Sequence, residues 1–189
     1  MTHARNLIAA AAALVLAACA SSAGGKYQDR NMDFGAIKSV AVMPFANLSR
    51  DNLAGDRVRD VFANALLATE AIYVVPTGEV ARAAGRIGIP NLTAPTNEEV
   101  TKLGQQLKAE AIITGVVKEY GEVRSGSATG NVVSLSVQLL ETKTGRVVWS
   151  GASTKGGITM GDRLLGGGGV PLNHATEAAI DDLLDQMFR

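Results

Sequence analysis

From residue 37 onward, apolar residues recur along the chain with two different periods. A period of three to four residues, typical of one face of an amphipathic helix, marks residues 53–69, 96–107 and 173–188. In the first stretch the apolar positions are Val58, Val61, Phe62, Ala65 and Leu66, and in the last they are Ile180, Leu183, Leu184 and Met187. A period of two, typical of a half-buried strand, marks residues 133–139, where valine and leucine alternate with serine and glutamine.

Nearly continuous apolar runs predict buried strands at residues 37–45, 72–75 and 111–120. A turn at residues 142–145, with Gly145 at the permissive position, predicts a returning strand at 146–154. Helix starts are indicated by Thr77, by the capping box of Thr96 and Glu99, and by Asn173. The order β-α-β-α-α-β-β-β-α predicts an α/β fold: one mixed β-sheet of about five strands covered by helices.

Two glycine-containing segments are predicted to be loops. Residues 122–131 are rich in glycine and serine, and residues 156–170 form a connection of a length that is uncommon unless it has a function. A phosphate-binding loop is excluded because Val170 and Pro171 follow the run Gly166, Gly167, Gly168 and Gly169, where Lys and Ser/Thr are needed. We therefore predict that residues 156–170 contact a partner or a second subunit, rather than merely connecting two elements.

The N-terminus is typical of an exported lipoprotein. His3 and Arg5 precede an apolar run over residues 7–18, which rises about 18 Å as a helix and is too short for a bilayer core of about 30 Å. The run ends in Leu16, Ala17, Ala18 and Cys19, which match a lipobox. We predict a signal peptide at 1–18, a lipidated Cys19 with a flexible tether at 19–35, and an α/β domain at 36–189. An ordinary signal peptide and a buried helix are the weaker alternatives.

Composition narrows the function classes. Hydrophobic residues make up 47% and charged residues 19%, which indicates a folded rather than a disordered chain. The 18 basic side chains balance 18 acidic ones, so no basic patch for nucleic acid is expected. The single Cys excludes an internal disulfide and a cysteine-cluster metal site.

No constellation of residues indicates catalysis or a cofactor. His174, near a helix start, has no nucleophile or orienting acid in a recognisable motif and is interpreted as a surface or capping residue. Trp149 is interpreted as a core or sheet-packing residue. We therefore expect no catalytic residue, no cofactor, no metal and no enzyme activity.

Three motifs resemble the CsgG-like superfamily of bacterial envelope lipoproteins. They are residues 40–47 (VAVMPFAN), 103–115 (LGQQLKAEAIITG) and 133–150, which includes the sequence TGRVVWS. Members of that superfamily serve curli secretion, exopolysaccharide export and the activation of peptidoglycan synthases. The resemblance implies a lipid-tethered, periplasm-facing α/β domain that acts by binding proteins, and ring oligomers occur in its channel and export members.

Together these observations predict an outer-membrane lipoprotein, because Ala20 and Ser21 rather than Asp follow Cys19. Its expected role is a non-enzymatic component of an envelope assembly or secretion machine, with envelope proteins and further copies of itself as partners and no nucleic acid. The alternative is a lipoprotein activator that docks on a peptidoglycan synthase, a penicillin-binding protein.

Overall fold

A computed structural model describes residues 25–159 and 169–188 of the 189-residue chain. The elements in chain order are β1 (Tyr27–Gln28), the 3-10 helix η2 (Phe34–Ala36), β2 (Ser39–Val42), β3 (Ala46–Asn47), α2 (Ala54–Ala68), β4 (Tyr73–Val75), α3 (Thr77–Ile87), α4 (Asn97–Leu107), β5 (Ala111–Ser125), β6 (Ala128–Glu141), β7 (Val147–Gly156) and α6 (Leu172–Phe188).

The strands form one mixed sheet in the order β1-β7-β6-β5-β2-β4, with β3 paired to β5 beyond the end of β2. β2 runs parallel to both β4 and β5, whereas β5, β6 and β7 form an antiparallel meander. The predicted α/β class and mixed sheet are therefore confirmed. The five predicted strands are β2, β4, β5, β6 and β7, and the two-residue strands β1 and β3 bring the sheet to seven.

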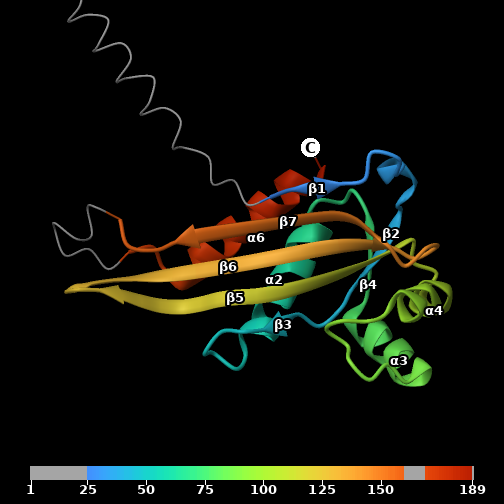
Figure 1. The fold of residues 1–189 in the computed structure, drawn as a ribbon, viewed down its shortest axis with the longest axis horizontal. Helices are drawn as coiled ribbons and strands as arrows, with labels where there is room; N and C mark the ends of the chain where they lie inside the picture. Colours follow the sequence, from blue (N-terminus) through green and yellow to red (C-terminus); the bar gives the residue numbers. More distant parts are fainter. Residues whose placement is uncertain (1–24, 160–168, 189) are drawn as a thin grey trace, which may run out of the picture.

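Helices cover the two faces of the sheet over different lengths. On one face α2 and α6 pack against Val133, Leu135 and Val137 of β6, whereas on the other face α3 and α4 form a smaller cluster with Ile112 and Leu140. Figure 1 shows α2 and α6 behind the meander and α3 and α4 gathered at the end where β2 and β4 lie. The alternate β6 side chains Ser134, Ser136 and Gln138 remain half-buried or exposed, as their spacing predicted.

The helices follow the predicted apolar stripes but begin at slightly different residues. The predicted capping box is present: Glu99 N–H donates to Thr96 Oγ1 at 3.3 Å, and Thr96 N–H donates to Glu99 Oε2 at 2.7 Å. Thr77 was expected to cap α3 but is its first residue, because Pro76 fixes the extended backbone that precedes it. Asn173, the expected cap of α6, likewise lies inside the first turn after Pro171.

The family motifs contact one another through glycines, and two of these, Gly104 and Gly145, lie at the end of the molecule that carries α3 and α4, here called the motif end. A Cβ atom at Gly104 would lie 2.2 Å from Thr142 Cβ, and one at Gly115 would lie 2.7 Å from the Phe45 ring. Gly145, at a φ of +70°, brings the β6–β7 turn so close to Asn97 that a Cβ would lie 2.4 Å from its carbonyl oxygen. These glycines serve packing, which explains why the motifs specify a fold.

Part of the segment expected to be a tether belongs to the domain. Tyr27 and Gln28 pair with Ser150 and Trp149 of β7, and Met32 and Phe34 pack against the larger core cluster. The expectation arose because residues 20–35 are mostly small and polar, and a two-residue strand leaves no periodicity to detect. Within the described residues, only Gly25 and Lys26 precede the first pairing.

Candidate functional site: the projecting arm

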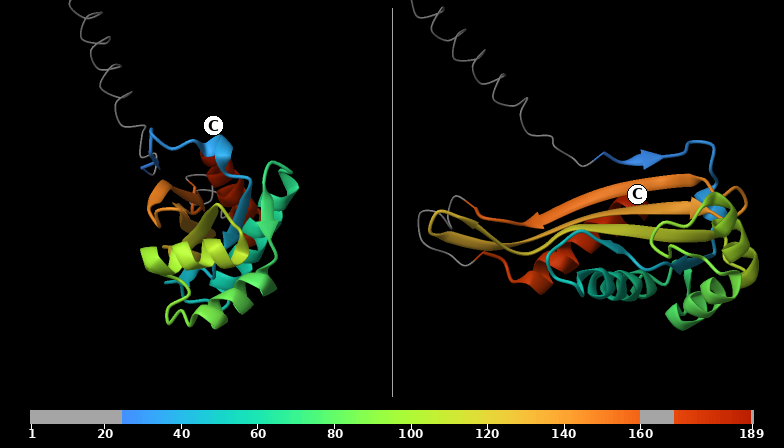
Figure 2. Two further views of the ribbon diagram at one scale, coloured as in Figure 1. Left: turned by 90° about the vertical axis from the view of Figure 1, so that its right-hand side faces the viewer. Right: turned by 60° about the horizontal axis from the view of Figure 1, so that its bottom comes forward.

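The β5–β6 hairpin projects beyond the helices that cover the rest of the sheet (Figure 2). We call its outer part, residues 118–134, the arm. The two strands stay in register from Tyr120 opposite Val133 to Ser125 opposite Ala128. Gly126, at a φ of +64°, supplies the left-handed conformation that a tight hairpin turn requires. The prediction of a loop at residues 122–131 is therefore wrong, because these glycine- and serine-rich residues extend two strands.

A bulge at Lys118 marks the base of the arm. The β5–β6 register shifts between Val117 and Glu119, so Lys118 has no opposite residue on β6. On its other edge β5 pairs with β3 only as far as Val117, whose carbonyl oxygen accepts a hydrogen bond from Leu48 N–H at 2.9 Å. From Lys118 to Ser125 no described strand pairs with this edge of β5. A bulge and alternating charges are two of the ways in which proteins protect such edges from indiscriminate pairing.

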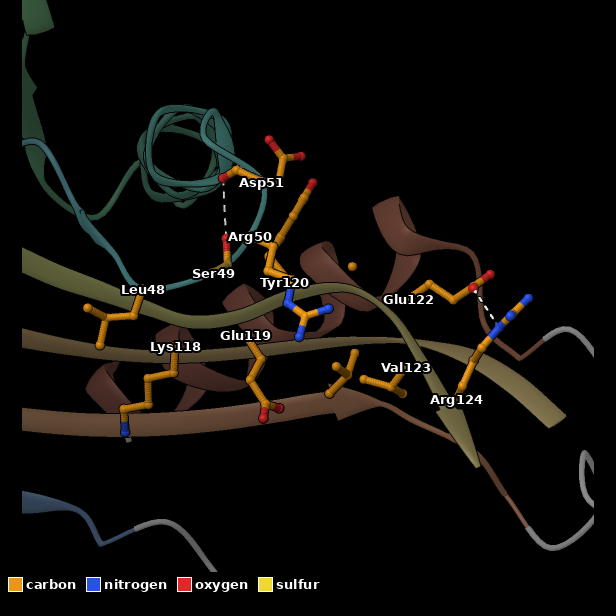
Figure 3. A pocket seen from close by; sticks show the side chains of 12 residues that line it. Leu48, Ser49, Arg50, Asp51, Lys118, Glu119, Tyr120, Glu122, Val123 and Arg124 are labelled. Atoms are coloured by element: carbon orange, nitrogen blue, oxygen red, sulfur yellow. Dashed lines mark hydrogen bonds and ion pairs between the residues drawn. The ribbon is translucent and has the colours of Figure 1, made fainter. Parts of the chain in front are cut away.

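A groove of about 910 Å³ lies between the arm and the loop that follows β3. Figure 3 shows the loop residues 48–51 on one side and β5 residues 118–124 on the other. The groove carries both signs of charge: Arg50, Lys118 and Arg124 stand with Asp51, Glu119 and Glu122. Exposed pairs such as Arg124 Nε with Glu122 Oε1, 3.4 Å apart, contribute little to stability. The groove is therefore a polar, open surface suited to a peptide backbone and not to a buried small molecule.

The loop after β3 holds a leucine in solvent. Asn47 Oδ1 accepts hydrogen bonds from Ser49 N–H at 3.0 Å and from its hydroxyl at 2.7 Å, while Asn47 Nδ2 donates to Asp51 O at 2.7 Å. Asp51 in turn accepts from Leu53 N–H at 2.9 Å and pairs with Arg57 at 2.8 Å. This network fixes the loop, yet Leu48 remains 72% exposed. A preorganised exposed aliphatic side chain beside a groove is a suitable anchor for a partner.

The predicted partner-contact loop begins and ends at the arm. Gly166, Gly167 and Gly168 lie outside the described residues, but Gly169 is described, and a Cβ on it would lie 2.9 Å from Gly130 Cα. Asn131 holds both ends: its carbonyl oxygen accepts from Gly157 N–H at 2.7 Å, and its Nδ2 donates to Val170 O at 3.0 Å. The connection after β7 therefore leaves and returns beside the arm, although a partner for it stays a prediction.

The other predicted site residues, Leu16, Ala17, Ala18 and Cys19, lie outside the described residues. Lipidation of Cys19 thus stays a prediction. No helix of the described residues has the length and apolar character needed to cross a bilayer.

Among the described residues, a cluster around Asp182 has side-chain types found in catalytic sites, but it joins α6 to the sheet. Asp182 of α6 accepts a hydrogen bond from Ser153 Oγ at 2.6 Å, lies 3.3 Å from Lys155 Nζ, and accepts from Gln186 Nε2 at 3.2 Å. The bond from Ser153 is the main reason that the pKa of Asp182 lies below its usual value, with Lys155 adding to the effect. Ser153 is buried beneath α6, so no substrate reaches its hydroxyl. The cluster stabilises the contact between β7 and α6.

The remaining residues considered for chemistry lie on the surface, in the core or at contacts between strands. His174 is exposed in the first turn of α6, and Trp149 is fully buried in the larger core cluster, as its interpretation required. A second carboxylate, Glu110, accepts hydrogen bonds from Ser39 N–H at 2.7 Å and Ser39 Oγ at 2.5 Å, which lower its pKa and join β2 to the start of β5. In residues 25–159 and 169–188, no group of three or more His, Cys, Asp or Glu side chains could hold a metal ion.

Sequence reasoning missed the arm, although two signals were available. The sequence Ser125-Gly126-Ser127 is a turn signal, and it is flanked by residues able to continue a hairpin. The groove could not be found in the same way, because it depends on the loop after β3 lying beside a strand that follows it by some seventy residues.

The fold and the site define an α/β domain with a projecting antiparallel arm. The chain belongs to the GNA1162-like family, described as "Putative lipoprotein GNA1162-like", whose family model matches residues 32–187. This confirms the resemblance to envelope lipoproteins that the three motifs indicated. No match was found among curated protein sequences.

Solved structures share this fold at low sequence identity. A PelC dodecamer from Paraburkholderia phytofirmans is 16% identical with a TM-score of 0.56, and the match covers 86% of this chain and 96% of that one. GNA1162 from Neisseria meningitidis is 23% identical with a TM-score of 0.54, covering 78% of this chain and 99% of that one. The C-terminal domain of LpoB from Escherichia coli is 18% identical with a TM-score of 0.50, covering 66% and 87%.

Proposed function

We propose that this protein is an outer-membrane lipoprotein, anchored through Cys19, that acts without catalysis in an envelope assembly or export machine by binding further copies of itself and other envelope proteins. The observation that carries the proposal is the arm with its groove, where a fixed loop holds Leu48 72% exposed. A partner that covers this leucine gains apolar burial without having to order the loop that carries it.

The architecture supports binding in a second way. The arm has one strand edge free of described partners, and strand edges recognise extended chains through backbone hydrogen bonds. The similarity to PelC, whose structure is a dodecamer, agrees with self-association as the mode of action. Several acyl chains on one cysteine would hold the protein stably at a membrane, whereas a single chain holds only marginally.

Replacement of the anchor tests the localisation. In the Cys19→Ala variant we expect the protein to leave the outer-membrane fraction, because no acyl chain can be attached. Ser21→Ala is the matched control, since it changes a neighbouring small residue and keeps the lipobox. Persistence of the Cys19→Ala variant in the outer-membrane fraction would overturn the anchor.

Replacement of the exposed leucine tests binding at the groove. We expect Leu48→Asp to lower the oligomer fraction in sedimentation velocity and to reduce the recovery of envelope partners after cross-linking in cells. Leu67→Asp is the control, because Leu67 is also exposed, at 50%, but does not line the groove. If both variants lost oligomer and partner recovery equally, the effect would not be specific to the groove. If neither did, the groove would not be the binding site.

The alternative, activation of a peptidoglycan synthase, is favoured by the fold shared with LpoB. The tether counts against it. Because β1 begins at Tyr27, only residues 20–26 separate the anchor from the domain, an extended reach of about 25 Å. That is half the reach of a 16-residue tether and is short for crossing a murein layer from the outer membrane. Recovery of one stoichiometric penicillin-binding protein with the wild-type protein would reverse this ranking.

A further inference from the structure

An apolar cavity of about 200 Å³ opens between the end of α6, the chain that follows α2 and the segment that joins η2 to β2. Figure 1 shows the C-terminal end of α6 close to β1 and the chain that follows it. The floor of the cavity is made of Val40, Ile113 and Leu139, which are at most 3% exposed. Its rim includes Phe188, which is 48% exposed. An apolar group can therefore enter this cavity from outside the protein.

The volume of the cavity limits what it can hold. A cavity of about 150 Å³ lined by leucine, isoleucine and phenylalanine stays dry and binds benzene, so a cavity of this size accommodates a hydrocarbon group of about eight carbon atoms. That is larger than a leucine side chain and much smaller than the row of anchors that a bound amphipathic helix presents. The size therefore favours one short hydrocarbon chain or one aromatic ring.

The charged residues around the cavity decide between these two groups. Of the described residues, Lys38 alone lines the cavity with a charge, and its side chain is exposed. A second hollow, of about 390 Å³, shares Phe34 with the cavity and is lined by Lys26 and Arg30, with Asp29 as its described carboxylate. Three cations thus stand beside one carboxylate around an apolar cavity. This arrangement favours a ligand with an anionic group next to its hydrocarbon.

We propose that the cavity binds the hydrocarbon chain of an anionic amphiphile, with its carboxylate or phosphate group at Lys38, Lys26 and Arg30. Burial of the chain supplies most of the driving force, and the exposed cations add selectivity for a negative head group. The aromatic side chain of a protein partner would fill the same volume, but it carries no negative charge to meet these cations. The amphiphile therefore satisfies both the cavity and the charges beside it.

The membrane is the nearest source of such an amphiphile under the proposed function. Because β1 begins at Tyr27, only residues 20–26 separate Cys19 from the domain, an extended reach of about 25 Å. The hollow that Lys26 lines thus stays within that reach of the surface at which a lipidated Cys19 is anchored. This source rests on the lipidation in the proposed function, whereas the binding itself does not. A free fatty acid is the other source of the same chemistry.

The only tryptophan of the chain can report on the cavity. Leu139 lies opposite Trp149 in the β6–β7 register, so their side chains are neighbours on one face of the sheet, and both belong to the larger core cluster. A bromine atom quenches tryptophan fluorescence only at short range. ω-Bromooctanoate carries bromine at the end of a chain of matching length, so it should quench Trp149 when it binds in the cavity.

Titration of the full-length lipoprotein in phosphatidylcholine vesicles with ω-bromooctanoate tests the proposal, at pH 7, where the carboxylate of the probe is ionised. We expect saturable quenching of Trp149. ω-Bromooctanol has the same chain without the charge and should bind severalfold more weakly. Bromopropionate has the charge without the chain and should not reach saturation over the same range. Quenching that rises linearly with concentration, or that is equal for all three probes, would overturn the proposal.

Substitutions at exposed positions locate the binding site. Ala71 lines the cavity, so Ala71→Phe should weaken the quenching severalfold, whereas Ala68→Phe adds the same ring outside the cavity and should leave it unchanged. Lys38→Glu should weaken binding of ω-bromooctanoate severalfold but not that of the alcohol, and Lys102→Glu on α4 should change neither. Saturable quenching that Ala71→Phe leaves unchanged would place the probe elsewhere near Trp149 and overturn the proposal.

Brominated lipids in place of the added probe distinguish the two sources. If a membrane lipid enters the cavity, vesicles of phosphatidylglycerol with brominated acyl chains should quench Trp149, and Ala71→Phe should restore the fluorescence. Quenching by added ω-bromooctanoate alone would support the proposal with a free fatty acid as the ligand. Quenching by neither would overturn it and leave the cavity to an aromatic side chain of a protein partner. Flotation of the vesicles reports the lipid anchor separately, so loss of the anchor is not mistaken for loss of binding.

Discussion

Glycines are found both at the motif end and in the arm, but their surroundings differ. At the motif end Gly104 and Gly145 have no room for a side chain, because Thr142 and Asn97 fill the space. At the arm Gly121 and Gly126 have open space where a Cβ would point, and both have positive φ. Glycine thus serves close packing at Gly104 and Gly145, whereas at Gly121 and Gly126 it serves backbone conformation alone.

This difference indicates where amino-acid substitutions are tolerated. Packed interiors resist even one added methyl group, because neighbouring atoms must move in concert. Two sheet strands that project into solvent depend mainly on register and turn conformation. The motif end should therefore set global stability, and the arm should vary in local stability and in what it binds.

The largest expected effect comes from Gly104→Ala. Its Cβ would lie 2.2 Å from Thr142 Cβ, and Thr142 cannot move easily because its hydroxyl donates to Ala109 O at 2.7 Å. We expect a loss of about 3 kcal/mol in the free energy of unfolding, measured by urea denaturation. Gly85→Ala in α3 is the control: its Cβ meets nothing within 4 Å, so a gain of about 0.5–1 kcal/mol is expected. Similar values for both variants would contradict the packing account.

The corresponding change beside the arm is Gly156→Ala, at the end of β7. A Cβ there would lie 2.1 Å from Asn131 O on a residue with a φ of +82°. We expect a local loss of about 1–3 kcal/mol, seen as faster hydrogen exchange of residues 128–133. Gly157→Ala has a similar φ of +94° but open space, so it isolates backbone strain and should cost about 1 kcal/mol. If Gly156→Ala sped hydrogen exchange equally at the motif end, the two regions would not differ in local stability as described.

A smaller effect is expected where α6 meets β7. Because the Ser153 hydrogen bond lowers the pKa of folded Asp182, its contribution is fully present above the ordinary carboxyl pKa of about 3.9 and is lost as the pH falls through the folded value. Asp182→Asn should therefore destabilise the protein by about 1 kcal/mol at pH 7, since the ion pair is partly exposed, and progressively less below pH 4. Urea denaturation across this range is the measurement, with the exposed neighbour Asp181→Asn as control. A difference that does not shrink as the pH falls below 4 would contradict the assignment.

The smallest effect on stability is expected from Leu48→Asp. The side chain is 72% exposed, so the free energy of unfolding should stay within about 0.5 kcal/mol of wild type while binding is lost. Thermal denaturation beside sedimentation velocity separates the two quantities. A marked loss of stability would show that Leu48 supports the fold and would weaken its role as an anchor.

The sequence allowed accurate prediction of the helix-covered part of the sheet for a physical reason. Stripes such as Val58, Phe62 and Leu66 must face a core, and the Thr96–Glu99 capping box is a local structure, so both leave a pattern in neighbouring residues. The fold class and the five longer strands followed from such patterns.

The arm and the groove could not be predicted in the same way. Residues 122–131 extend two strands because register from Val133 onward continues into them, although their glycine and serine content is typical of loops. The groove depends on Leu48 and Tyr120 approaching through the β3–β5 pairing, which joins distant parts of the chain. Cys19 and the glycines at 166–168 remain predictions from the sequence.

The way in which Asn131 fastens the connection after β7 has a consequence for how this family can diversify. Both ends of the connection are fixed at Asn131, through Gly157 and Val170, so the distance between these ends does not depend on how many residues lie between them. Doubling the length of such a loop costs only about 0.6 kcal/mol. Insertions and deletions there should therefore cost the rest of the domain little stability.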